Sequence, residues 1–410
     1  MRTPLKWKML RKKQTGARQK ILQTRFMIII RRRKTMKRRN LTAALVMGTM
    51  AAGLLTGCGG AQKTAGTAAS TAAAETAVSS EAETAGETTQ GAAGKKEFKV
   101  GIVQFMDHPS LNQIEENLEK ELDKIAQEKG VTFNYKDYTH NGQGDATILN
   151  QIGSQLIADE VDVIVPIATP AAQVMQSAAE DSATPIVFSA VSDPVGAKLV
   201  ADMKKPGANI TGTSDALNTN AIMDLIVALN PQAGKIGLLY SKSEDSSAQP
   251  IADAKKYLDG KGIQYVEKTG TTSDEVSAAV DALIAEGVDA VFTPTDNTVQ
   301  SAELGFYEKL AEAGIPHYAG ADSFALNGAF CGYGVDYANL GVATADMVAE
   351  ILVDGKKPAE TAVQTFDNGI ATVNTDTAAA IGIDLAQVKT AFTPFCTQIV
   401  EIKTQKEFKN

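Results

Sequence analysis

The chain has 410 residues, 44% hydrophobic and 21% charged, an ordinary globular composition that leaves room for two domains with buried cores. Its net charge is −8, but the first 57 residues hold 16 Lys or Arg and no Asp or Glu, which leaves 24 basic against 48 acidic residues in the remainder. An acidic main body repels nucleic acid, and three scattered His and three Cys without metal-ligand spacing exclude an obvious zinc site.

The N-terminal region has the pattern of a signal peptide that begins at Met36. Residues 37–39 are basic, and residues 41–55 are apolar, uncharged and too few to span a membrane comfortably. The motif Leu55-Thr56-Gly57-Cys58 follows and resembles the lipobox of bacterial lipoproteins. The resemblance implies that Cys58 accepts a diacylglycerol and becomes the first residue of the mature chain. A plain secreted protein with a chance cysteine is the alternative.

The segments on either side of this signal differ from it. Residues 1–35 carry 13 basic residues and fit either a start codon assigned too far upstream or a real basic extension. Residues 59–96 are nearly all Gly, Ala, Thr, Ser, Glu and Gln, and so cannot form a core. We expect residues 1–57 to be an extension plus signal peptide, and residues 58–97 to be a disordered tether.

From about Phe98, short apolar runs alternate with amphipathic segments. Strands are predicted at 98–105, 131–135, 161–167, 185–191 and 209–214, and helices at 111–125, 148–156, 171–180 and 195–203. The first helix shows the pattern most clearly, because its apolar residues recur every three or four positions and Gly130 follows as a stop.

The alternation continues after residue 214. Helices are predicted at 222–229, 251–258, 275–285, 299–313 and 341–353, and strands at 235–240, 264–267, 288–292, 317–320 and 371–374. Two such runs predict an α/β fold with two doubly wound parallel-sheet lobes. Ligands of such sheets bind outside the carboxyl ends of the strands, so the cleft between the lobes is the expected site.

Three loops of the first half place a proline where a strand ends and a helix begins. They are His108-Pro109-Ser110, Thr169-Pro170 and Asp193-Pro194. Because the free N–H groups of helix starts attract anions, three of them at one sheet edge suggest a seat for a carboxylate. The alternative is that each loop is only a well-formed turn.

The second half offers acidic residues at comparable places. Thr295-Asp296-Asn297 ends a strand, while Asp322 and Asp336 lie in later loops, and a carboxylate there could pair with a ligand ammonium. Alternatively, Asp296 only caps the helix that follows. Phe105, Tyr333 and Tyr337 could line an apolar pocket or belong to the core.

Several blocks of sequence resemble one family, the ABC transporter substrate-binding proteins of the tryptophan/tyrosine type. The blocks are IATPAAQ at 167–173, FSAVSDPVG at 188–196, GANITGTSD at 207–215, YSKSEDSS at 240–247 and PTDNT at 294–298. The resemblance implies a type I periplasmic-binding-protein fold with three crossovers near Thr213, Tyr333 and Lys357. An N-lobe would comprise 98–213 and 334–356, and a C-lobe 214–333 and 357–410.

The resemblance also implies a function. The lobes would close on a small zwitterion, an amino acid and often an aromatic one, and an ABC permease with its ATPase would receive it. The protein would be a lipid-anchored, extracytoplasmic monomer without a cofactor. The ligand-site residues that we predict are Phe105, His108, Ala168, Thr169, Ser189, Ala190, Asp193, Tyr240, Thr295, Asp296, Asn297, Asp322 and Asp336.

Other readings have less support. The sequence gives little support to an enzyme, because it contains no Gly-x-Ser-x-Gly elbow, no Walker loop and no nucleophile near a histidine. Asp296 and Asp322 could in principle act as an acid and a base. A lipoprotein sensor of a small ligand or of a partner protein is the alternative function. Cys331 and Cys396 are either two buried thiols or a disulfide.

Overall fold

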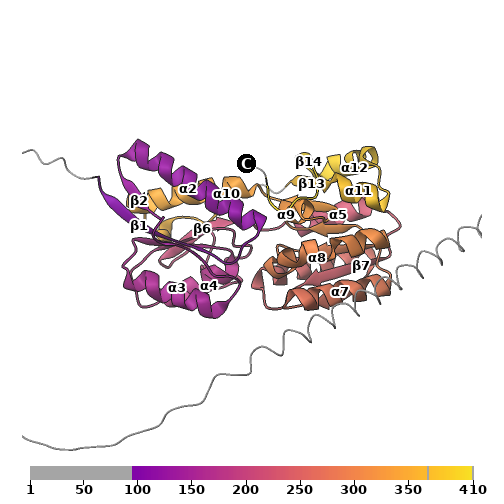
Figure 1. The fold of residues 1–410 in the computed structure, drawn as a ribbon, viewed down its shortest axis with the longest axis horizontal. Coiled ribbons are helices and arrows are strands. Elements are labelled where there is room, and N and C mark those ends of the chain that lie inside the picture. The colour runs from indigo at the N-terminus through magenta and orange to yellow at the C-terminus, as the bar shows by residue number, and fades with distance from the viewer. Residues whose placement is uncertain (1–94, 367–368, 409–410) are drawn as a thin grey trace, which may run out of the picture. The chain divides into compact units, whose positions relative to one another are not determined.

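The structure, a computed structural model, describes residues 95–366 and 369–408. The predicted extension, the signal peptide, Cys58 and nearly all of the tether lie outside these residues. Within them the chain forms two α/β lobes, each a seven-stranded sheet with helices on both faces (Figure 1). No helix in this part of the chain combines the length and apolar character that a membrane crossing requires.

The first sheet has the strand order β12-β6-β5-β4-β1-β2, and β3 also pairs with β1. Its strands are β1 (Glu97–Gln104), β2 (Thr132–Asn134), β3 (Thr139–Asn141), β4 (Val163–Ile167), β5 (Ile186–Phe188), β6 (Ile210–Ser214) and β12 (Gln364–Thr365). All its pairs are parallel. The helices α2 (Pro109–Lys129) and α10 (Tyr337–Leu352) cover one face, and α3 (Ala146–Ala158) and α4 (Thr169–Ala178) the other (Figure 1).

The helix α2 shows how local sequence sets these elements. Its predicted apolar row, Leu111 to Ile125, is buried at every position, and the helix ends at Gly130, whose φ of 69° is left-handed. Asp145 caps α3, since its side chain accepts hydrogen bonds from the backbone N–H groups of Thr147 and Ile148.

The second sheet has the order β14-β13-β11-β10-β9-β7-β8 and one antiparallel pair, β11 with β13. Its strands are β7 (Lys235–Tyr240), β8 (Gln264–Thr269), β9 (Ala290–Thr293), β10 (His317–Ala319), β11 (Cys331–Gly334), β13 (Ile370–Asn374) and β14 (Gln398–Ile402). Its helices are α5 (Thr219–Leu229), α6 (Ala248–Lys261), α7 (Ser273–Glu286), α8 (Asn297–Ala313), α9 (Asp322–Leu326), α11 (Thr375–Ile381) and α12 (Leu385–Phe392). The helices α5 and α12 lie on one face, and α7 and α8 on the other (Figure 1).

The chain passes between the sheets after β6, after β11 and again between β12 and β13. The last passage differs from the boundary that we expected at residue 357, because Gln364 and Thr365 still pair with Thr213 and Ser214 of the first sheet.

Several elements differ from the prediction. Residues 195–203 form turns rather than a helix, since the Asp193 side chain accepts from Gly196 N and Lys198 has a positive φ of 62°. The prediction also omitted β3, β11, β12, β14, α9, α11 and α12. These elements are short, so they carry too few apolar residues to show a period.

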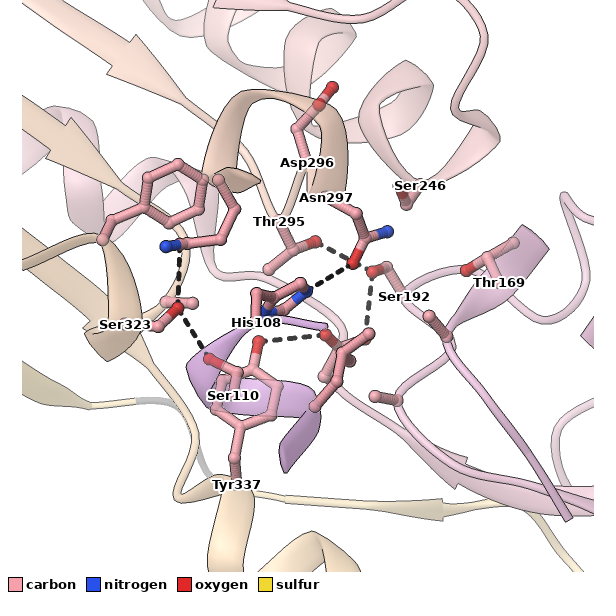
Figure 2. Close-up of a pocket in the computed structure, with 17 residues that line it drawn as sticks. His108, Ser110, Thr169, Ser192, Ser246, Thr295, Asp296, Asn297, Ser323 and Tyr337 are labelled. Carbon is pink, nitrogen blue, oxygen red and sulfur yellow. Dashed lines mark hydrogen bonds between the residues drawn. The ribbon is translucent and has the colours of Figure 1, made fainter. Parts of the chain in front are cut away.

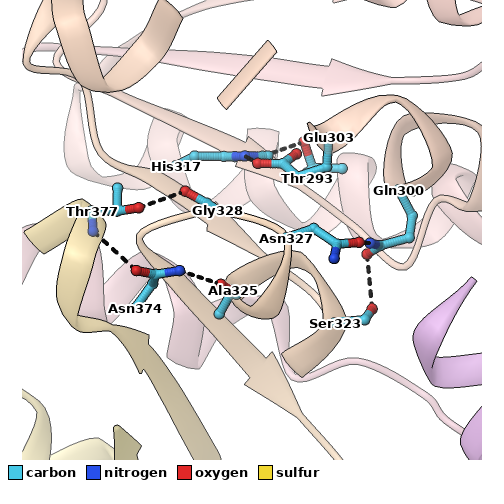
Figure 3. Close-up of polar contacts among 10 residues, drawn as sticks. All are labelled: Thr293, Gln300, Glu303, His317, Ser323, Ala325, Asn327, Gly328, Asn374 and Thr377. Atoms are coloured by element: carbon cyan, nitrogen blue, oxygen red, sulfur yellow. Dashed lines mark hydrogen bonds and ion pairs between the residues drawn. The ribbon is translucent and has the colours of Figure 1, made fainter. Parts of the chain in front are cut away.

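The second lobe also contains a buried polar network (Figure 3). The ring of His317 in β10 pairs with Glu303 of α8 through Nδ1 at 3.0 Å, and with Thr293 of β9 through Nε2 at 2.8 Å. Asn374 at the end of β13 donates to Ala325 O and caps α11. The network ties α8, β9 and β10 together directly behind the loop that begins at Pro294.

Candidate functional site

A cleft lies where the carboxyl ends of the strands of both sheets face each other (Figure 2). Residues from the first lobe line one wall and residues from the second lobe the other. The polar residues of the lining are His108, Ser110, Thr169, Ser192, Asp215, Ser246, Thr295, Asp296, Asn297, Gln300, Ser323 and Tyr337. The lining contains no Lys or Arg.

Seven of the thirteen predicted ligand-site residues line this cleft. They are His108, Ala168, Thr169, Ala190, Thr295, Asp296 and Asn297. Each lies within four residues of the end of a strand, so the strand-end rule that selected them also explains why the fold brings them together.

Four predicted residues are placed elsewhere. Ser189 lies beneath the cleft and bonds Thr213 and Thr344, and Asp193 holds the turn after it. Tyr240 donates to Glu267 at the end of β7, away from the cleft lining. Asp336 is exposed and caps α10 through Ala338 N and Asn339 N, so the structure does not bring it to the cleft where we expected an ammonium partner.

Phe105 and Asp322 lie beside the cleft rather than in its lining. Phe105 contributes to a neighbouring cavity of about 490 Å³ whose walls come from both lobes. Asp322 is partly buried, and its Oδ1 lies 3.4 Å from the hydroxyl oxygen of Ser110, a residue of the lining. Desolvation raises the pKa of Asp322 to about 7.

Asp215, which the sequence prediction missed, is the centre of a chain of hydroxyl contacts. Ser192 donates to its Oδ1 at 2.9 Å and Tyr337 to its Oδ2 at 3.1 Å. Because the Ser192 proton goes to Asp215, Thr295 of the other lobe must donate in the 2.9 Å contact between the two hydroxyls. Burial raises the pKa of Asp215, and no Lys or Arg in the lining balances the charge of its carboxylate form.

Thr169 begins α4 on the same wall of the cleft as Asp215, where α4 follows β4 of the first sheet. Its hydroxyl is buried, lines the cleft and has no hydrogen-bond partner among the residues that the structure describes. Two alanines of the same lining have positive φ angles, 81° at Ala168 and 54° at Ala190. Such angles are strained for a residue with a Cβ. A free hydroxyl at a helix start can bind an anion.

Two acidic residues organise the start of α8. Glu244 accepts from the backbone N–H groups of Asn297 and Thr298, and Asp296 accepts from Val299 N, Ser241 N and the Ser247 hydroxyl. Burial, and then the nearby Glu244, raise the pKa of Asp296 to about 8. Asp296 is therefore occupied as a helix cap, the alternative that the sequence left open.

Hydrogen bonds also join the two walls directly. His108 contacts Asn297 at 2.9 Å and Ser110 donates to Ser323 at 2.7 Å (Figure 2). The cavity that remains is about 20 Å³, enough for one water-sized group. A ligand the size of an amino acid therefore needs the neighbouring cavity, or a small separation of the lobes.

Sequence reasoning missed several polar residues of the lining. They are Ser110, Ser192, Asp215, Ser246, Gln300 and Ser323. Asp215 follows the predicted strand 209–214 directly, so the same strand-end rule could have selected it. Tyr337, for which the sequence left a pocket position and a core position open, lines the cleft.

Comparison with known families places the chain. Residues 99–390 match the family of ABC transporter substrate binding proteins. The chain belongs to this family. A curated relative, the tyrosine-binding protein of Clostridioides difficile (strain R20291), is 34% identical over 288 residues, which cover 70% of this chain and 81% of the relative.

Solved structures agree with the assignment to ABC substrate-binding proteins. An ABC domain from Streptococcus pneumoniae in complex with L-Trp is 32% identical, covers 73% of this chain and 100% of its own, and superposes with a TM-score of 0.66. A ligand-free, open structure of a substrate-binding protein with adhesive properties from Clostridium difficile is also 32% identical. It covers 75% of this chain and 100% of its own, and superposes with a TM-score of 0.57. These neighbours confirm the predicted fold class.

As an ABC transporter substrate-binding protein, the chain is a binding protein and not an enzyme. Proteins of this family act outside the cytoplasm. Within residues 95–366 and 369–408, no group of three or more His, Cys, Asp or Glu side chains could hold a metal ion.

Proposed function

We propose that this chain is the lipid-anchored subunit of an ABC importer that captures a small zwitterion, an aromatic amino acid such as tyrosine or tryptophan. The names of two relatives support the ligand class, one as a tyrosine-binding protein and one as a complex with L-Trp. The observation that carries the proposal is a buried carboxylate, Asp215, that shares a cleft with the unpaired Thr169 hydroxyl at a helix start and with no basic side chain.

The two ends of a zwitterion match these two groups. The ligand ammonium would supply the cation that Asp215 lacks, with the partly buried Asp322 adding negative potential behind Ser110. The ligand carboxylate would lie at Thr169 and the first turn of α4. Since the walls belong to different lobes, a ligand that contacts both favours the closed arrangement.

The N-terminal sequence carries the anchoring part of the proposal. A basic start, a short apolar stretch and the Cys58 lipobox together indicate lipidation, and the segment up to residue 97 indicates a tether. Metabolic labelling with a palmitate analogue should label the protein but not a Cys58→Ala variant. Equal labelling of both would remove the anchor from the proposal.

Calorimetric titration tests the ligand class. L-tyrosine and L-tryptophan should bind, whereas analogues that lack the amino group or the carboxyl group should bind at least tenfold more weakly. The variant Asp215→Asn, which keeps its shape and can still contact Ser192, should lose about 10–100-fold in affinity, since a hydrogen bond to a charged group is lost.

The matched control is Asp336→Asn, which changes an exposed helix cap outside the cleft and should leave affinity unchanged. Equal affinity for the analogues without an amino group, or wild-type affinity in Asp215→Asn, would contradict a zwitterion site. Uptake of labelled ligand that stops when the permease is deleted would test the importer role.

A further inference from the structure

Glu244, in the loop between β7 and α6, receives more hydrogen bonds than a helix cap needs. Each of its carboxylate oxygens accepts one backbone N–H group, from Asn297 at 3.0 Å and from Thr298 at 2.6 Å. The Thr298 hydroxyl and the Asn297 side-chain amide also donate to it, at 2.7 and 2.6 Å. Since backbone N–H groups can only donate, Glu244 acts at this place as an acceptor.

This acceptor fixes the orientation of the Asn297 side chain. Its Nδ2 must point to Glu244, because the opposite orientation would bring two oxygens within 2.6 Å of each other. Its Oδ1 therefore points across the cleft to His108 Nε2, which lies 2.9 Å away (Figure 2).

The orientation of Asn297 in turn determines the tautomer of His108. An amide oxygen is only an acceptor, so His108 Nε2 must carry the hydrogen in this contact. Burial lowers the pKa of His108 to about 4, so the ring is neutral at neutral pH and carries only that one hydrogen. Its Nδ1 is therefore an unprotonated nitrogen with a free lone pair.

The lone pair has no partner. His108 is 8% exposed and lines the cleft, and its Nδ1 is buried without a hydrogen bond to any residue that the structure describes. Burying an acceptor without a donor costs free energy, so a ligand whose N–H group donates to this nitrogen would be favoured.

We propose that His108 Nδ1 is an acceptor for the ligand ammonium beside Asp215, and that Glu244 and Asn297 are positioning residues that hold the ring in the required tautomer. This inference rests on the proposed function, because it assumes a ligand with an amino group. Glu244 and Asn297 belong to the second lobe and His108 to the first. The tautomer is therefore set by closure, and the acceptor is complete only when the lobes meet.

Nuclear magnetic resonance reads the tautomer directly. The chain has three histidines, so the full-length protein labelled with 15N in its histidine rings gives few signals, and a His108→Gln variant identifies that of His108. With saturating L-tyrosine, His108 should show a protonated Nε2 and an unprotonated Nδ1. The reverse pattern, or a doubly protonated ring, would overturn the proposal.

Two variants at the same position separate the two nitrogens. In His108→Gln the terminal amide can reach Asn297 but leaves no acceptor at Nδ1, whereas in His108→Asn the side-chain oxygen can replace Nδ1 but not reach Asn297. We expect His108→Gln to lose about tenfold in affinity for L-tyrosine, as for one lost hydrogen bond, and His108→Asn to keep part of it.

The ligand can be varied in parallel. N-methyl-L-tyrosine has one N–H donor fewer, so methylation should weaken binding to the wild type about tenfold and to His108→Gln much less. An equal methylation penalty in both proteins, or wild-type affinity in His108→Gln, would overturn this inference alone. A wild type that binds neither tyrosine nor tryptophan would overturn the proposed function together with it.

Discussion

Two threonine hydroxyls, on Thr169 and Thr219, are buried without a hydrogen-bond partner among the described residues. Thr169 lines the cleft, whereas Thr219 begins α5 and does not. Because Val has the shape of Thr without the hydroxyl, we expect both Val variants to keep or slightly raise stability. Thr169→Val alone should lose about tenfold in affinity for L-tyrosine by calorimetry. Equal affinity in the two variants would mean that the Thr169 hydroxyl does not bind the ligand carboxylate.

Asp322 gives a prediction about pH, because desolvation raises its pKa in the folded protein to about 7 from 3.8. The ligand-free folded protein thus holds this proton more tightly than the unfolded chain. The resulting stability is present below pH 4 and is lost as pH rises through 7. In chemical unfolding, the free energy of unfolding of the wild type should fall between pH 5 and 7 by on the order of 2 kcal/mol more than that of Asp322→Asn. Parallel pH profiles would contradict the shift.

The sequence could predict His108, Thr169 and Asn297, because each lies shortly after a strand that has a clear apolar run. It named both Asp336 and Tyr337 as candidates, but it could not decide which of these neighbours faces the cleft, and the structure places Tyr337 there and Asp336 outside it. That difference depends on the direction in which α10 leaves the crossover, which no local pattern encodes.

The helices α2 and α10 pack closely because residue 341 is glycine. A Cβ at this position would lie 2.4 Å from the backbone oxygen of Ile114. Gly341→Ala should therefore cost about 1–3 kcal/mol in urea unfolding. The matched control is Gly305→Ala in α8, an exposed position where a Cβ meets nothing within 4 Å, and it should gain up to about 1 kcal/mol. Similar changes in both variants would show that helix packing does not depend on Gly341.

Prediction of the elements succeeded where tertiary and local preferences coincide, as in α2, whose apolar row covers one face of the sheet. It failed over 195–203, where apolar residues at helical spacing form turns that Asp193 stabilises. It also missed β12, a two-residue edge strand that exists only because the chain returns to pair with β6. Such an element has no sequence period of its own, since the rest of the sheet determines it.

In the molecule as a whole, the contacts between the lobes lie at two depths. The hydroxyls of Thr295 and Ser192 form a part-buried hydrogen bond in the cleft. Gln173 donates to Asp245 at 2.8 Å in an exposed contact at the rim. We expect the part-buried contact at the cleft to stabilise the closed state more than the exposed contact at the rim, because exposed polar contacts contribute little to stability.

Variants at the two depths test this inference. Thr295→Val removes the hydroxyl that donates to Ser192 and should weaken L-tyrosine binding about tenfold, whereas Asp245→Ala breaks an exposed contact and should change affinity less than about threefold. Small-angle X-ray scattering should show the wild type becoming more compact when ligand is added, because closure and binding are coupled. An unchanged radius of gyration at saturation would mean that the cleft is already closed without ligand, and an equal loss in both variants would place the closing contacts at the rim.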